Sequence, residues 1–239
     1  MSTNNNIFSN TIAEYYSGKL ASLALLNRIA SSDYLQSIKL LISYGYVGDA
    51  VGNDDINEFI NLQIEHLKAF IIEYCPTAVA KEFLFNMLGN KKLSKENLLL
   101  AKKLGTPYLN YLKINIDITN ILSLYRGKKL ELHLHEVESH LVAGGFVCIE
   151  DLFSNDVPSI YSDTTAALTN NNIASFRLIV HELLLNTISH QFTDFSTIGP
   201  FIKFALAKIS ELKTVKLILI SIKNNITPDS SYIRSFADE

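Results

Sequence analysis

The chain has 239 residues, a formal net charge of −3 and a hydrophobic content of 48%. This length suffices for one large domain or two small ones, and the apolar content excludes an intrinsically disordered chain. The acidic balance and the scattered lysines and arginines create no field that would recruit nucleic acid, so no nucleic-acid partner is expected.

Helical periodicity recurs along the chain, whereas glycine, proline and hairpin signals are scarce. Helices are predicted at about 12–26, at 34–43, from a cap at Asp54 or Asp55 to Pro76, and at 77–87. Further helices are predicted at about 94–104, 106–130, 131–142, 164–191 and 200–223, with a short one beginning at Thr227. The glycine pair Gly144-Gly145 is expected to end the helix before it. The pattern predicts an all-α fold, divided into an N-terminal helical module (1–89) and a C-terminal one (90–239).

The stretch 114–130 combines an apolar stripe with charges along its borders. The stripe comprises Ile118, Ile121, Leu122 and Tyr125. At 100° per residue, Asp117 and Lys128 flank it on one side and Arg126 on the other. Asp117 and Arg126 are half a turn apart and cannot pair with each other. Each is therefore expected to meet solvent or a partner on a different neighbouring helix.

Candidate catalytic groups have structural interpretations. The acidic cluster 53–58 fits helix capping, and Glu150-Asp151 fits a turn or a helix start. The possible metal ligands on one predicted helix face are His133, Glu136 and His140. They spread over two helical turns, which is too far apart for one ion, so they are interpreted as a solvated polar face. Motifs for nucleotides, cofactors or nucleophilic catalysis are missing from the sequence. We expect no catalytic residue, cofactor or metal, and an all-α enzyme with an acidic metal site is an alternative.

Membrane insertion and secretion are not expected. The longest apolar run, Leu212–Ile222, is interrupted by two lysines and falls short of the roughly 20 residues that a membrane helix needs. The polar, uncharged start Met1–Asn6 predicts no signal peptide. Cys75 and Cys148 lack metal-ligand spacing and are predicted to be buried, reduced thiols. A cytoplasmic protein that meets a membrane only through a partner is therefore expected.

Two stretches of the chain carry polar, proline and glycine residues at characteristic spacings. The first comprises Asp117, Asn120, Arg126, Lys128, Gly144 and Gly145. The second comprises Pro200, Lys208, Glu211, Pro228 and Arg234. Both stretches resemble the C/d subunits of V-type and A-type rotary ATPases. The N-terminal half fits more loosely, through Lys19-Leu20, Tyr44-Gly45-Tyr46 and Cys75-Pro76. The family is usually longer, with three related helical modules, so the short stretch 80–112 predicts a reduced middle module.

The resemblance implies a non-catalytic, funnel-like, all-α rotor subunit. Such a subunit lies at the cytoplasmic end of the membrane rotor ring, receives the tip of the central stalk and rotates with both. It would thereby couple ATP hydrolysis or synthesis to ion transport, with the stalk subunits and the ring as partners. The matching residues become structural or interface candidates. The alternative interpretation is a free-standing, all-helical adaptor or scaffold.

Overall fold

Over the residues that it describes, the computed structural model is 74% helical, which confirms the all-α fold class. The structure describes residues 3–49, 55–89, 93–154, 158–228, 233 and 235, and no strand occurs among them. The chain divides into unit 1, residues 1–90 and 191–239, and unit 2, residues 91–190. The sequence was divided into modules 1–89 and 90–239, whereas residues 191–239 group here with the N-terminal residues in unit 1.

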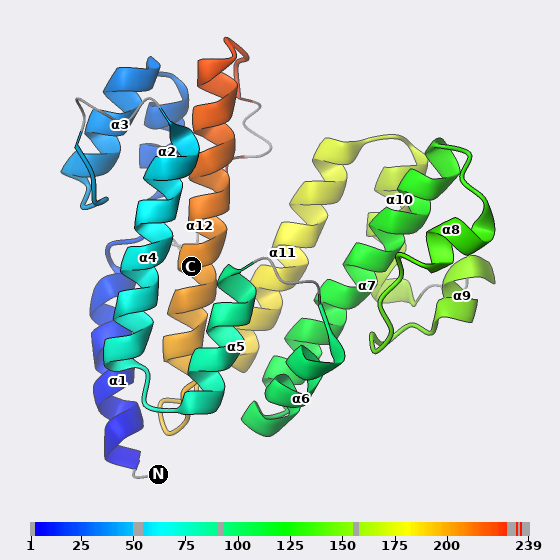
Figure 1. The fold of residues 1–239 in the computed structure, drawn as a ribbon, viewed down its shortest axis with the longest axis horizontal. Coiled ribbons are helices and arrows are strands. Elements are labelled where there is room, and N and C mark those ends of the chain that lie inside the picture. Colours follow the sequence, from blue (N-terminus) through cyan, green and yellow to red (C-terminus); the bar gives the residue numbers. More distant parts are fainter. Residues whose placement is uncertain are drawn as a thin grey trace. The chain divides into compact units, whose positions relative to one another are not determined.

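Unit 1 is built around one long central helix. It contains α1 (Thr3–Ser17), α2 (Leu23–Ala30), α3 (Tyr34–Ser43), α4 (Ile56–Tyr74), α5 (Ala78–Leu88) and α12 (Gly199–Lys223). Figure 1 shows α12, in orange, beside α4, and it contacts each of the other five helices. α12 is apolar on most of its circumference, and a helix of that kind is stable only when surrounded. Its buried residues include Leu212, Val215, Ile218 and Leu219.

The helix boundaries in unit 1 follow the expected local chemistry. Asp33 and Thr77 cap α3 and α5 through their side chains, and Asp55 does the same for α4. These side-chain oxygens accept hydrogen bonds from amides that have no partner inside the helix. Pro200 lies in the first turn of α12, where a missing amide costs nothing, and Asn224 caps its end.

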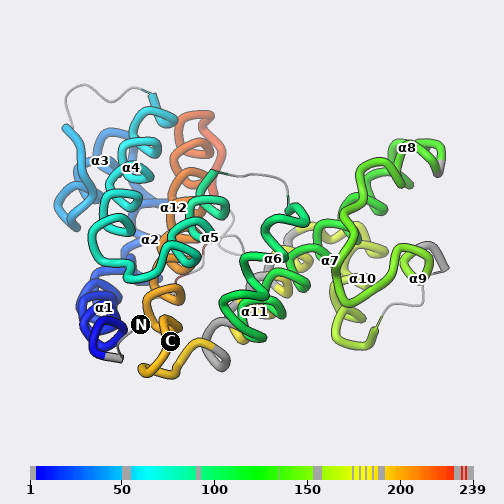
Figure 2. The backbone as a smooth tube through the Cα atoms, turned by 60° about the horizontal axis from the view of Figure 1, so that its bottom comes forward, coloured from blue at the N-terminus to red at the C-terminus, as the bar shows by residue number. Residues whose placement is uncertain are grey.

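Unit 2 is organised around α7. Its elements are α6 (Lys95–Leu104), α7 (Thr106–Lys129), α8 (Leu134–Glu138), α9 (Ile149–Ser154), the 3-10 helix η1 (Ser159–Tyr161), α10 (Ser162–Thr169) and most of α11 (Ile173–Gln191). Figure 2 traces α6 running beside the first half of α7, and the two helices are in contact. The apolar stripe of α7 faces a core shared with α9, η1, α10 and α11. This core contains Ile114, Ile118, Ile121, Val147, Leu152, Tyr161, Ala167, Leu168 and Phe176.

Two predicted helices are each broken in the structure. The helix expected at 12–26 is divided into α1 and α2. The break occurs because the Ser22 side chain caps α2 by accepting the Leu25 amide, while the Ala21 amide donates to a side chain of α12. The one expected at 164–191 is α10 plus α11. There, Asn171 takes a left-handed φ of 54°, and the Asn172 side chain accepts the Ser175 amide at the start of α11. Local capping therefore overrides apolar periodicity at both places.

The helix predicted at 131–142 shrinks to the five residues of α8. Glu131 has a φ of 53°, and Val142 is bound by a side chain of α7 instead of continuing the helix. The glycine pair lies well beyond Glu138, where α8 ends, so it does not terminate a helix as expected. Glu150-Asp151 does lie in a helix start, the first turn of α9.

The remaining expectations concern the tail, the thiols and the membrane. Thr227 and Pro228 are not helical, and the rest of the short helix predicted there lies outside the described residues. Cys75 is buried as predicted. Cys148 was also predicted to be buried, but it is exposed and directly precedes α9. Among the helices described, none has both the length and the apolar character that crossing a bilayer requires.

Candidate functional site

Asp117 is the buried anchor of unit 2. Its side chain is 0% exposed, although it sits on the border of the apolar stripe of α7. One carboxylate oxygen accepts the Tyr161 hydroxyl at 2.7 Å and the Phe146 amide at 3.0 Å, and the other accepts the Val147 amide at 3.3 Å. Three donors converge on one charge. The carboxylate on α7 therefore binds two other parts of unit 2: the loop that precedes α9, and the 3-10 helix η1.

The pKa values of the pair reflect this environment. Burial raises the pKa of Asp117, and the hydrogen bonds from Tyr161 and from the loop amides oppose that rise. Burial and the neighbouring carboxylate both raise the pKa of the Tyr161 hydroxyl, which therefore stays protonated and keeps donating. The partners of Asp117 are thus two loop amides and the hydroxyl of Tyr161, which lies on the neighbouring 3-10 helix η1.

Asn120 holds the same loop one turn further along α7. Its side chain donates to the Val142 carbonyl at 2.8 Å and accepts the Val142 amide at 2.9 Å, so both backbone groups of one residue are satisfied. Asp117 and Asn120 together fix the loop 142–147 at both of its ends. The spacing of three residues matters because it places both side chains on one face of the helix.

The glycine pair makes this attachment possible. A Cβ atom built on Gly145 would overlap the Asp117 carboxylate, and one built on Gly144 would overlap Leu98 of α6. Gly144 also has a φ of 107°, which an L side chain rarely adopts. Four of the residues named from the sequence, Asp117, Asn120, Gly144 and Gly145, therefore lie together as one structure, which we call the loop clamp.

We expect Gly145→Ala to destabilise the protein by about 2–3 kcal/mol, because the new methyl group must displace the buried carboxylate or the loop it binds. Chemical denaturation followed by circular dichroism measures this change. Gly18→Ala is the matched control: its Cβ would meet only the Tyr15 carbonyl, at an ordinary 3.7 Å, and it should change stability by less than about 1 kcal/mol. Equal effects of the two substitutions would contradict the clamp.

Unit 1 contains a second buried carboxylate, Glu211 of α12, which is 3% exposed. It accepts the Ala21 amide at 2.5 Å, the Tyr46 hydroxyl and the Lys208 ammonium group. The Lys208 ammonium group also lies 4.3 Å from the centre of the Tyr46 ring. Burial first, and then Glu211, raises the pKa of Tyr46, which keeps its hydroxyl a donor. As in unit 2, a carboxylate on the long helix binds a backbone amide and a tyrosine hydroxyl.

The remaining candidate residues lie apart from these two carboxylates. Pro200 is buried in the first turn of α12, and Pro228 is partly buried beyond its end. Arg126 is exposed, and within the described residues it forms no ion pair, so its charge lies in solvent, one of the two alternatives expected from the sequence. Its position in the last turn of α7 still favours a positive charge, because the helix dipole is negative there. Arg234 lies outside the described residues.

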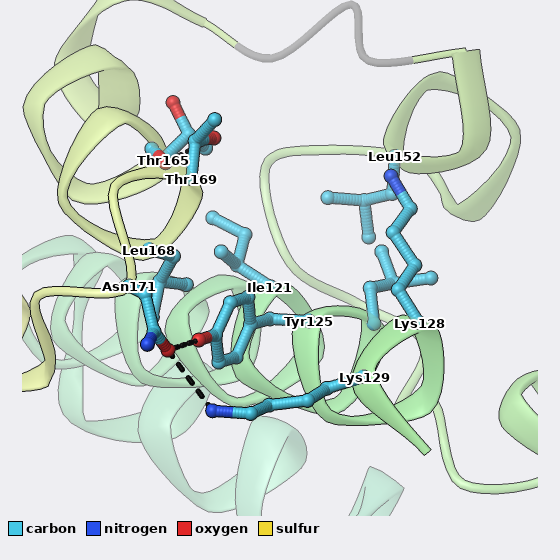
Figure 3. Close-up of a pocket in the computed structure, with 10 residues that line it drawn as sticks. Ile121, Tyr125, Lys128, Lys129, Leu152, Thr165, Leu168, Thr169 and Asn171 are labelled. Carbon is cyan, nitrogen blue, oxygen red and sulfur yellow. Dashed lines mark hydrogen bonds between the residues drawn. The ribbon is translucent and has the colours of Figure 1, made fainter. Parts of the chain in front are cut away.

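Lys128 lines a pocket of about 520 Å³ in unit 2, shown in Figure 3. The floor is apolar and is contributed by α7, α9 and α10. The lining residues are Ile121, Leu124, Tyr125, Lys128, Lys129, Leu152, Thr165, Leu168, Thr169 and Asn171. Asn171 accepts the Tyr125 hydroxyl at 2.5 Å and the Lys129 ammonium group at 3.0 Å. Sequence analysis named only Lys128 of this set as a candidate.

The residues of the possible metal sites do not converge. Among the described residues, no group of three or more His, Cys, Asp or Glu side chains could hold a metal ion. Glu136 accepts the His133 amide at 2.9 Å in the first turn of α8, and Asp55 accepts the Asn57 amide at the start of α4. These carboxylates serve the helix starts that they border.

Sequence analysis missed the hydroxyl partners of the two carboxylates. Tyr46 lies in the Tyr44-Gly45-Tyr46 element that carries part of the resemblance, and this was the available signal. Tyr161 carries no such signal, because it is one tyrosine among eleven and lies 44 residues from Asp117. Its role depends on a long-range contact that periodicity does not report.

Comparisons with known proteins give one family. Residues 81–232 match the ATP synthase (C/AC39) subunit family, which covers more than half of the chain and contains both α7 and α12. No curated protein and no solved structure matches the chain significantly. The matched region includes the loop clamp and Glu211, as well as Lys128 at the pocket. The chain therefore belongs to the ATP synthase (C/AC39) subunit family, the C/d subunits of V-type and A-type rotary ATPases.

Proposed function

We propose that the chain couples the central stalk of its rotary ATPase to the membrane rotor ring and catalyses no reaction itself. Family membership over residues 81–232 is the observation that carries this proposal. The role is mechanical: the subunit rotates with stalk and ring, so that ATP hydrolysis or synthesis is linked to ion transport. It acts at the cytoplasmic face and meets the membrane through the ring.

The internal construction of each unit supports a mechanical role. A part that transmits torque must keep its loops in place under load, since a displaced loop would absorb the motion. In unit 2, Asp117 and Asn120 attach the loop 142–147 to α7 through four hydrogen bonds, and Asp117 accepts a fifth from Tyr161 of η1. In unit 1, Glu211 attaches the turn at Ala21 to α12. Close-packed units with bound loops resist deformation.

Deleting the gene should uncouple ATP hydrolysis from ion pumping. The catalytic head would still hydrolyse nucleotide, but its rotation would no longer reach the ring. The measurement compares ATP hydrolysis with ATP-driven ion uptake in membrane vesicles from the deletion strain and from the parent. Complementation with the intact gene should restore uptake. Normal ion uptake in vesicles that lack the protein would refute the coupling role.

Co-purification distinguishes this role from that of a free-standing adaptor. A tagged chain should bring down both stalk and ring subunits from detergent-solubilised membranes. Capture of neither, under conditions that keep the ATPase intact, would favour the adaptor.

A further inference from the structure

The loop between α11 and α12 is where the chain returns from unit 2 to unit 1. α11 ends at Gln191, the residue at which unit 1 resumes. Residues 192–198 follow, none of them helical, and we call them the junction loop. The other crossing between the units, at residues 90 and 91, lies outside the described residues. Loops at such crossings are where hinge motions are absorbed, so the restraints on this loop bear on how the protein moves.

The junction loop has a defined shape of its own. The Asp194 carboxylate accepts the Ser196 amide at 2.8 Å and the Ser196 hydroxyl at 2.7 Å. The Asp194 carbonyl accepts the Thr197 hydroxyl at 2.8 Å, and that hydroxyl accepts the Gly199 amide at 3.1 Å at the start of α12. The hydrogen bonds from Ser196 lower the pKa of Asp194, so its carboxylate remains an acceptor at neutral pH.

α1 holds this loop through the side chain of Asn10. The side-chain amide donates to the Phe195 carbonyl at 3.0 Å and to the Thr197 carbonyl at 2.8 Å. Its oxygen accepts the Phe201 amide at 3.2 Å, in the first turn of α12. One side chain therefore binds both the loop and the helix that follows it. Figure 2 shows the loop, in gold, beside α1, in blue.

The burial of Asn10 indicates that holding the loop is its task. Asn10 is 0% exposed, and a buried asparagine inside a helix is costly unless its hydrogen bonds are made. Residues 193–197 are exposed, and a surface loop of this kind usually leaves its backbone groups to water. One turn earlier on α1, Asn6 donates to the Ser196 carbonyl at 3.0 Å. The same helix face thus attaches the loop at two levels.

We propose that Asn10 fixes the junction loop to α1 and thereby prevents unit 2 from swinging about this loop when the subunit carries torque. The inference rests on the proposed function and deepens it, because it names the residue that keeps a connection between the units stiff. Units joined by a loop move relative to one another unless they are restrained, and a free loop would absorb rotation in its backbone dihedrals. Asn10 lies outside the matched range 81–232, so the family match assigns it no role.

Asn10→Asp is the variant that releases the loop with the smallest change of shape. An aspartate keeps an oxygen for the Phe201 amide, but it places its second oxygen against the carbonyls of Phe195 and Thr197. A carboxylate has no donor for these carbonyls and repels them. Circular dichroism checks that the variant keeps its helix content.

Gln63→Leu is the matched control. Gln63 is 6% exposed and also holds a loop of unit 1 with its side-chain amide. It accepts the Val47 amide at 2.9 Å and donates to the Val47 carbonyl. That loop follows α3, and the chain does not cross between the units there. The control therefore removes a buried amide of the same kind without touching the junction.

Pulsed electron paramagnetic resonance on the full-length chain measures the motion between the units. One spin label is attached to Cys148, an exposed thiol of unit 2, and the other to Gln36→Cys, at an exposed position of α3 in unit 1. Cys75→Ala prevents labelling of the other thiol in every sample. Asn10→Asp should widen the distribution of distances about twofold or more, and Gln63→Leu should leave it unchanged.

Two results of this measurement would overturn the inference. Equal widening by both variants would show a general loosening of unit 1. An unchanged width in Asn10→Asp would show that the loop needs no such attachment, and it would leave the proposed function standing. Should Asn10→Asp lose helix content, Asp194→Ala replaces it, because Asp194 is exposed and its removal frees the loop from within. This variant should widen the same distribution, and failure to do so would also overturn the inference.

Membrane vesicles test the mechanical consequence. Ion uptake per ATP hydrolysed should fall in Asn10→Asp and remain normal in Gln63→Leu. Normal uptake in Asn10→Asp, despite a widened distribution, would overturn Asn10 as a restraint that carries torque. Normal uptake in vesicles that lack the protein altogether would instead overturn the proposed function, so the two failures are distinguishable.

Discussion

Glu211→Ala is expected to lower the free energy of unfolding by about 3 kcal/mol, the lower end of the cost of removing one partner of a buried ion pair. The substitution leaves the buried Tyr46 hydroxyl and the Ala21 amide without their acceptor. Lys208, which is 22% exposed, can turn to water and limits the loss. Urea denaturation followed by circular dichroism measures the change, and faster amide exchange in α12 would locate it in unit 1.

The chain offers a matched control for this prediction. Lys68 and Glu65 are also three residues apart on a helix, and their ion pair measures 2.7 Å, but Glu65 is 66% exposed. Removing it in Glu65→Ala should cost less than about 1 kcal/mol, because water replaces the lost partner. A similar loss of stability for the two alanine variants would show that the burial of Glu211 does not determine its contribution.

Asp117→Ala is expected to destabilise unit 2 by about 3 kcal/mol at neutral pH. Tyr161 and the Val147 amide are buried and would lose their acceptor, which is costly for each group. Relief of the cost of burying the charge offsets part of this loss, since burial raises the pKa of Asp117. Denaturation curves give the total, and amide exchange at 142–147 reports release of the loop. Asp163→Ala, at an exposed aspartate of α10, should change stability by less than about 1 kcal/mol.

The same carboxylate predicts a pH dependence with a definite sign. Because the pKa of Asp117 is raised in the folded state, the folded protein binds this proton more readily than the unfolded chain. The resulting stability is fully present below the unfolded pKa of about 3.9 and is lost as pH rises through the folded-state value. The free energy of unfolding of the unaltered protein should therefore rise, relative to that of Asp117→Asn, as the pH is lowered from neutral. A difference that stayed constant would contradict the buried titration.

The helices were predictable to the extent that local chemistry decided them. The predicted range of about 34–43 coincides with α3, and Pro76 and Pro200 marked an end and a beginning that the structure has. The two helices that were wrongly joined share one cause. At Ser22 and at Asn172, a side-chain cap interrupts an apolar pattern that continues on both sides, so periodicity alone reads straight through the break.

The interior of the candidate site was only partly predictable. The sequence placed Asp117 and Asn120 on one face of a helix and drew attention to Gly144 and Gly145. It could not relate the two pairs, because they meet through a loop whose path depends on tertiary contacts. Sequence periodicity therefore predicted a charge at the edge of a stripe, whereas the structure has a carboxylate with no exposed surface. The pocket depends on Asn171, whose position follows from the break between α10 and α11.

The division of unit 1 into two stretches of chain has a consequence for how the protein is made. A ribosome delivers α1–α5 first, then all of unit 2, and only afterwards the central helix α12. Until then, Leu26, Leu41 and Phe59 lack the neighbours that bury them, while unit 2 can fold as soon as it emerges. The nascent N-terminal helices are consequently the part of this protein most in need of a chaperone, and slow translation between residues 91 and 190 would lengthen their exposure.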